Sequence, residues 1–169
     1  MASRIHWNLF LIVMALAAAH IVWAHGQVPD TVATHFGGDG QANGWSSRSS
    51  FTILYIVLVV MMGGLFALIA ALLPRLPEGA ISMPNRDYWL APERRAKTMR
   101  RFGDRMLVFG CVSTFFVVGI MHLTVLANRT DAPRLGASFW LLFTAYMVFT
   151  LVWTVWLVLG MRVPRRPDR

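Results

Sequence analysis

The sequence contains a single cysteine, Cys111, and few charged residues for its length. One cysteine can form neither a disulfide within the chain nor a cysteine-based metal cluster, so both are excluded. Charged residues make up 14% of the 169 residues, whereas an ordinary soluble domain has about 25%. Because 56% of the residues are hydrophobic, the composition indicates a membrane protein.

Signatures of catalysis are also absent from the sequence. It has no Gly-x-Ser-x-Gly elbow, no phosphate-binding loop and no His-Glu-x-x-His motif. The long apolar segments contain no Asp or Glu. This argues against proton-coupled transport, because that process generally uses a carboxylate inside the membrane. We therefore expect a protein that is not an enzyme.

Four long apolar segments are present, at residues 5–24, 51–73, 106–127 and 138–161. About 20 apolar residues suffice to cross the hydrocarbon core of a bilayer. Because lipid offers no hydrogen bonds to the backbone, each segment should be a helix. The sequence therefore predicts an all-α membrane protein, a four-transmembrane-helix bundle.

Basic residues are distributed unequally between the two sides of these segments. All but three of the 16 Lys and Arg residues lie on the side that holds both chain ends; the exceptions are Arg48, Arg129 and Arg134. Cytoplasmic loops are enriched in Lys and Arg, so both termini are predicted to be cytoplasmic. The formal charge of +8 then reflects membrane topology, and no nucleic-acid partner is expected.

The predicted topology divides the chain into three parts. Residues 1–73 form a first helix hairpin with an external loop at 25–50, residues 74–105 form a basic cytoplasmic loop, and residues 106–169 form a second hairpin with a basic C-terminal tail. The fourth span is rich in aromatic residues, and we expect it to face lipid.

Small residues recur every four positions in two of the spans. Gly63, Ala67 and Ala71 form one such stripe, and Gly110 and Thr114 form a second. Stripes of this kind let helices approach closely. The contact could lie within one chain or between the subunits of a homo-oligomer, and we favour the first.

The cytoplasmic loop contains the start of an amphipathic helix. Pro92 suits the first turn of a helix and Glu93 suits its positive end. Apolar residues then recur at spacings of three and four up to Met106, so the helix should run toward Arg105 and could continue into the third span. Its basic residues are candidates for binding anionic lipid headgroups: Arg94, Arg95, Lys97, Arg100, Arg101 and Arg105.

The external loop predicts a small folded cap. Residues 31–36 have β character, and glycine-rich turns follow at 37–40 and 43–44. A hairpin over the outer ends of the helices fits this pattern. The segment from Asp39 imitates half of a calcium loop, but Ser50 stands where a Glu ligand is expected, so we interpret it as a turn.

Two motifs carry a resemblance to a known family. The first comprises Pro29-Asp30, Val32, Thr34-His35-Phe36, Gly40 and Gly44-Trp45. It resembles the bacterial domain of unknown function 1648, which occurs in SdpI-like integral membrane proteins. The second runs from Pro84 to Arg95 and is similar to the P-N-x-x-Y-W-x-x-P-E-R stretch of small members of this group.

The resemblance implies a multi-pass protein of the bacterial inner membrane, with a role related to immunity against a secreted toxin peptide. On this basis we expect a non-enzymatic protein that binds or senses a peptide, an envelope component or a partner membrane protein. Candidate binding residues are His35, Phe36, Asp39, Gly40, Gly44 and Trp45 outside, and Asn85, Tyr88, Trp89, Glu93 and Arg94 inside. Phe36 and Trp45 could instead form the small core of the cap.

Histidines suggest an alternative function. His20, His25, His35 and His122 are all predicted near the outer side of the membrane. Imidazole is a common ligand of zinc and copper, so these residues could form a metal site or a metalloenzyme centre. Otherwise no cofactor is expected. Hydrogen bonding of the same side chains to neighbouring helices and loops would also explain them, and we favour this simpler interpretation.

Overall fold

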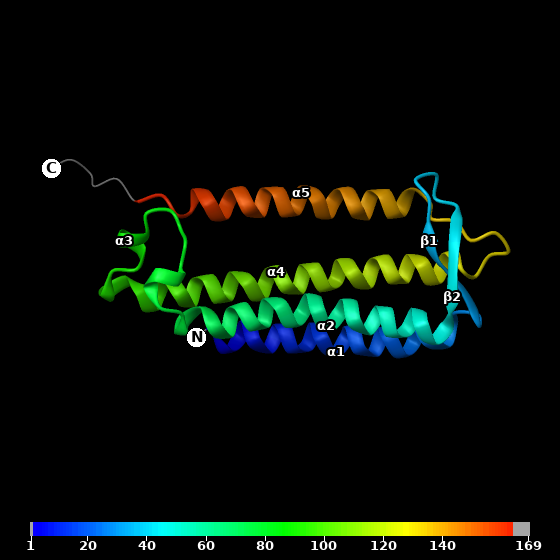
Figure 1. Ribbon diagram of the computed structural model, residues 1–169, viewed down its shortest axis with the longest axis horizontal. Helices are drawn as coiled ribbons and strands as arrows, with labels where there is room; N and C mark the ends of the chain where they lie inside the picture. Colours follow the sequence, from blue (N-terminus) through cyan, green and yellow to red (C-terminus); the bar gives the residue numbers. More distant parts are fainter. Residues whose placement is uncertain (1, 164–169) are drawn as a thin grey trace.

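The computed structural model describes residues 2–163, so the basic C-terminal tail predicted beyond residue 163 lies outside the described part of the chain. The elements are, in chain order, α1 (Arg4–Gln27), β1 (Thr31–Phe36), β2 (Ala42–Ser47), α2 (Arg48–Leu72), η1 (Leu73–Arg75), η2 (Glu78–Ala80), α3 (Arg86–Trp89), α4 (Pro92–Ala127) and α5 (Ala137–Leu159). Figure 1 shows the long helices side by side, with the hairpin across one end and α3 at the other.

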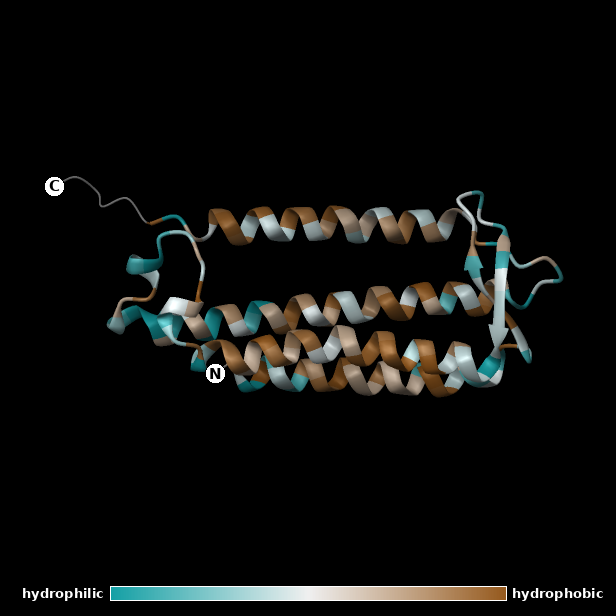
Figure 2. Cartoon of the chain, in the orientation of Figure 1, coloured by the Kyte–Doolittle hydropathy of each residue, from teal (hydrophilic) through white to brown (hydrophobic). Residues whose placement is uncertain are grey.

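Helices α1, α2, α4 and α5 are each long and apolar enough to cross a membrane. This confirms the four predicted spans and indicates a multi-pass membrane protein. Figure 2 shows apolar residues along the middle of these helices and hydrophilic residues gathered at both ends. That distribution is expected of helices that meet hydrocarbon in the middle and headgroups at the ends.

The helices form a group of three with a fourth beside it. Helices α1, α2 and α4 pack closely against one another, whereas α5 contacts mainly α4 and has no buried residue. The Tyr146 hydroxyl hydrogen-bonds Ser113 Oγ at 2.8 Å, and its ring stacks on Phe116 with a centroid distance of 4.0 Å. Bulky aromatic residues on α5 keep its backbone away from the group, so the predicted four-helix bundle is a three-helix core with a peripheral, largely exposed α5.

Small residues let the three core helices approach one another. A Cβ added at Gly110 of α4 would lie 2.8 Å from the Phe66 Cβ of α2, and one at Gly63 of α2 would meet the Met14 side chain of α1. Both glycines therefore serve contacts within the chain, as the sequence favoured.

Helix α4 is one continuous helix of 36 residues, about 54 Å long at 1.5 Å per residue. It begins at Pro92, with Glu93 in its first turn. The prediction that the basic amphipathic helix continues into the third span is therefore confirmed.

The predicted hairpin is also formed. Strands β1 and β2 are antiparallel, with Thr31 opposite Ser47 and Phe36 opposite Ala42, and irregularities in the register near His35. At the turn, Gly40 has a φ of 81°, a left-handed conformation that favours glycine. Its carbonyl accepts a 2.9 Å hydrogen bond from Leu135 N–H, which joins the hairpin to the loop before α5.

Candidate functional site

The hairpin is fixed to the end of α4 by one buried side chain, Asn128. Asn128 Oδ1 accepts a 2.7 Å hydrogen bond from Ala33 N–H, and Nδ2 donates to the Ala33 carbonyl at 2.9 Å. Nδ2 also donates to the Thr124 carbonyl at 2.9 Å. The Asn128 amide thus pairs with strand β1 as another strand would, and it holds the cap in one position.

An ion pair closes the base of the hairpin. Arg48 Nη2 lies 2.9 Å from Asp30 Oδ1, and Arg48 N–H donates a 3.0 Å hydrogen bond to the Asp30 carbonyl. Directly below, Val32 and Phe51 are buried and belong to the main hydrophobic core. The cap is therefore continuous with the packed helices.

A pocket of about 200 Å³ lies between the cap and the helices. Strand β1, helices α2 and α4, and the start of α5 contribute its walls. The lining residues are Thr34, His35, Phe36, Phe51, Leu54, Ile120, Met121, Thr124, Leu135 and Phe139. Apolar and aromatic side chains dominate, with a few polar groups, which is the usual make-up of a ligand pocket.

Two of the predicted cap residues, His35 and Phe36, line this pocket, while Trp45 is elsewhere on the hairpin. Trp45 is 56% exposed, so the interpretation that it belongs to a small cap core is wrong. One face of the two-stranded hairpin lies against the helices. The Trp45 side chain, on β2, is largely exposed.

The remaining predicted cap residues build turns. Asp39 Oδ1 accepts a 3.0 Å hydrogen bond from Gln41 N–H. Gly44 lies against the His35 side chain, where an added Cβ would come within 2.9 Å of the His35 Cβ. Asp39, Gly40 and Gly44 therefore shape the loop, in agreement with the turn interpretation.

A chain of hydrogen bonds links three helices below the cap. The Tyr55 hydroxyl of α2 bonds His20 Nδ1 of α1 at 2.9 Å, and His20 Nε2 bonds His122 Nδ1 of α4 at 3.1 Å. Tyr55 is fully buried, and the Trp23 ring stacks on His122 with a centroid distance of 5.3 Å. These side chains join the core helices near the ends that carry the cap.

The cap, His20 and parts of α1 and α2 lie in a segment that matches a family model. Residues 10–61 match the family model of a domain of unknown function (DUF1648). This match supports the kinship predicted from the first motif. No curated protein and no solved structure matches the chain. The DUF1648 segment contains α1 from Phe10, the whole hairpin and α2 as far as Met61.

The four predicted metal-ligating histidines do not gather in one place. His20 and His122 meet, but His25 Nδ1 bonds Thr52 Oγ1 at 2.8 Å and His35 Nδ1 bonds Asn43 Oδ1 at 2.5 Å. Within residues 2–163, no group of three or more His, Cys, Asp and Glu side chains could hold a metal ion. Metal binding by the His20–His122 pair stays a prediction.

Replacing His20 with leucine should lower the free energy of unfolding by about 2 kcal/mol, because the buried Tyr55 hydroxyl then lacks a partner. Tyr55→Phe removes that hydroxyl and should cost about 1 kcal/mol. The double variant should be more stable than the sum of the single losses indicates. Unfolding of the purified protein in mixed micelles measures all three, and strictly additive losses would contradict the Tyr55–His20 bond.

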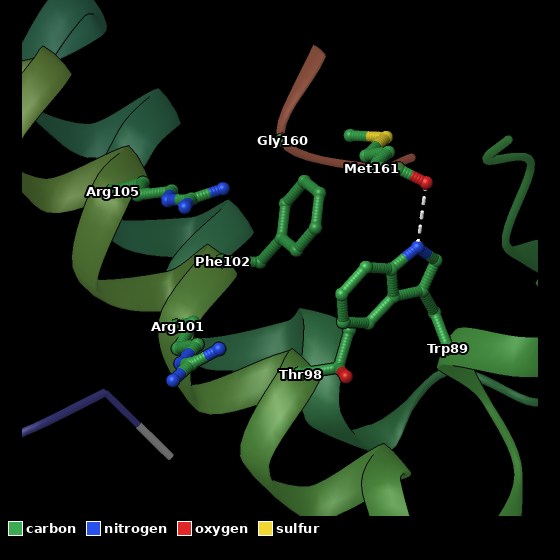
Figure 3. Close-up of a pocket in the computed structure, with 7 residues that line it drawn as sticks. All are labelled: Trp89, Thr98, Arg101, Phe102, Arg105, Gly160 and Met161. Atoms are coloured by element: carbon green, nitrogen blue, oxygen red, sulfur yellow. Dashed lines mark hydrogen bonds between the residues drawn. The ribbon is translucent and has the colours of Figure 1, made fainter. Parts of the chain in front are cut away.

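The second motif lies outside the DUF1648 segment and holds the chain at the C-terminal end of α5. Asn85 Nδ2 and Trp89 Nε1 both donate to the Met161 carbonyl, at 3.0 and 2.7 Å. Asn85 adopts a φ of 53°, a left-handed conformation that asparagine tolerates better than most residues. The Trp89–Met161 bond is drawn in Figure 3.

The other residues of this motif also make internal contacts. Arg94 Nε donates to the Tyr88 carbonyl at 2.7 Å, and its guanidinium lies over the Tyr88 ring at 4.2 Å. Glu93 pairs with Arg94 at 2.8 Å. These contacts shape the turn that leads into α4.

Proposed function

We propose that the protein is a non-enzymatic multi-pass membrane protein that binds a peptide, or a peptide segment of a partner, beneath its hairpin cap. The pocket lined by His35, Phe36 and Leu54 carries this proposal. It is large enough for one or two apolar side chains. The Asn128 and Arg48 contacts position the cap before any ligand arrives, which reduces the entropy lost on binding.

Aromatic residues support a role in recognition. Phe36, Phe51 and Phe139 line the pocket, and Trp45 adds a large exposed ring to the hairpin. Large aromatic side chains contribute a disproportionate share of binding energy at protein interfaces. The exposed Trp45 ring is available to a partner or to the membrane interface, where tryptophan is enriched.

The bias of basic residues supports a cap outside the cytoplasm and both termini inside. The resemblance to SdpI-like proteins supports the bacterial inner membrane and a secreted peptide as ligand. On this proposal the cap captures the peptide at the outer face, before it enters the bilayer. The protein would then act in immunity or as an accessory to it.

Photo-crosslinking in intact cells tests the proposal. A benzophenone amino acid replaces His35 in the pocket, and the same residue at Lys97, at the opposite end of α4, is the control. We expect a peptide or protein adduct at position 35 that is absent at position 97. No adduct at position 35, or the same adduct at both positions, would count against binding under the cap.

A pair of neighbouring substitutions makes this test specific for the pocket. Leu54→Trp fills the pocket, whereas Ile53→Trp adds the same side chain at an exposed position, 61% accessible, that does not line it. Leu54→Trp should lower the adduct yield about tenfold, equivalent to losing about 1.4 kcal/mol of binding. Ile53→Trp should leave the yield unchanged, and equal losses would show that the pocket is not the binding site.

A further inference from the structure

The basic residues at the start of α4 fall into two groups that the sequence could not separate. Arg94 bonds the Tyr88 carbonyl, and Arg95 Nη2 donates to the Leu76 carbonyl at 2.7 Å. Each also lies near a carboxylate, Arg94 beside Glu93 and Arg95 within 4.0 Å of Glu78. Both guanidinium groups therefore have partners inside the protein, and they are poor candidates for holding a lipid headgroup.

Arg101 and Arg105 have a different environment. They lie one turn apart on α4 and line a pocket between this helix and the chain that follows α5. Figure 3 shows both side chains at this pocket, whose other lining residues are Trp89, Thr98, Phe102, Gly160 and Met161. The Arg105 guanidinium lies 4.2 Å from the centre of the Trp156 ring, which fixes its position.

Within the described part of the chain, neither of these arginines forms a salt bridge. Within residues 2–163, the salt bridges involve only His6, Arg48, Arg94 and Arg95 as cations. Two like charges one turn apart on a helix destabilise it unless an anion lies between them. Among the described residues, the pocket is lined by two arginines and by no Asp or Glu.

The position of the pocket indicates which anion fits. Arg105 directly precedes the apolar part of α4, and α5 ends at Leu159, just before pocket residues Gly160 and Met161. The pocket therefore lies where hydrocarbon gives way to headgroups. Apart from Thr98, its remaining lining residues are apolar or aromatic, which suits a ligand whose charged group is attached to an acyl-glycerol.

We propose that this pocket binds the phosphate of an anionic phospholipid, with Arg101 and Arg105 as its ligands. Guanidinium groups bind phosphate oxygens through paired, charge-assisted hydrogen bonds. A zwitterionic lipid would bring a second cation next to the arginines and should bind less well. The inference depends on the helices crossing a membrane, and not on the peptide proposed to bind under the cap at the other end.

Native mass spectrometry of the full chain in micelles tests this site, with phosphatidylglycerol and phosphatidylcholine as the added lipids. We expect one phosphatidylglycerol to be retained in preference to phosphatidylcholine. Arg101→Gln with Arg105→Gln should weaken that binding about tenfold more than Lys97→Gln with Arg100→Gln. Both double variants lose two positive charges, and Lys97 and Arg100 do not line this pocket.

Three outcomes would overturn the proposal. Equal weakening by the two double variants would indicate diffuse surface attraction instead of a site. Displacement of the lipid by millimolar inorganic phosphate would indicate a site for free phosphate. Arg101 is exposed, so the Arg101→Gln variant should fold normally. Undiminished lipid binding by this variant would contradict the proposed site. Crosslinking at position 35 should be unchanged in every one of these variants. Failure of the lipid proposal is therefore distinguishable from failure of the proposal that a peptide binds under the cap.

Discussion

Replacing Asn128 with alanine is expected to lower the free energy of unfolding by about 3 kcal/mol and to release the hairpin from the helices. The Asn128 amide satisfies Ala33 N–H and the Ala33 carbonyl, and Ala33 is fully buried. Without it, both backbone groups lose their partners in a place that water reaches poorly. Each such orphaned group costs about 1–3 kcal/mol.

Unfolding in mixed micelles measures the total loss, and amide hydrogen exchange locates it. Exchange at Ala33 should become faster in the variant, while exchange in the middle of α2 changes little. Asn43→Ala is the matched control, because Asn43 is exposed and bonds only the His35 side chain. Asn43→Ala should lower the free energy of unfolding by no more than about 0.5–1 kcal/mol. A comparable loss in both variants would show that Asn128 does not hold the hairpin.

The parts of the fold that depend on local sequence were predictable. Twenty or more apolar residues in succession predict a spanning helix, and β-forming residues before Gly37–Gly40 predict a hairpin. Pro92 marks the start of α4 for a similarly local reason. In each case the determining residues are neighbours in the chain, so the structure confirms these elements closely.

Contacts between distant residues were not predictable in the same way. Asn128 meets Ala33 across 95 positions, and Trp89 meets Met161 across 72. An asparagine after an apolar run reads as an ordinary loop residue, and a backbone carbonyl such as that of Met161 has no signature at all. The only available signal for Asn128 was a polar side chain directly after the third span.

The same limitation explains the histidines and the arginines. The depth expected from the sequence suggested that four histidines lie together. In the structure, Thr52 and Asn43 hydrogen-bond His25 and His35 and hold them elsewhere. Helical spacing grouped six basic residues, yet only the folded loop shows that Arg94 and Arg95 are occupied by internal contacts. Which polar groups remain available for a ligand therefore depends on tertiary structure.

Gly110→Leu is expected to destabilise the three-helix core by about 3 kcal/mol, near the upper end for overpacking. A Cβ at this position would lie 2.8 Å from the Phe66 Cβ, an atom next to the backbone of α2 that cannot rotate away. Helices α2 and α4 would have to separate. The rest of the leucine side chain would add to this separation.

Gly64→Leu is the matched control, since a Cβ at Gly64 has no neighbour within 4 Å and Gly64 is exposed on α2. Leucine favours helix formation more than glycine does, so this variant should be unchanged or stabilised by up to about 1 kcal/mol. Unfolding in mixed micelles compares the two. If both variants were equally stable, Gly110 would not lie in a close helix contact. If Gly64→Leu alone were harmful, the exposed face of α2 would itself be covered by another chain.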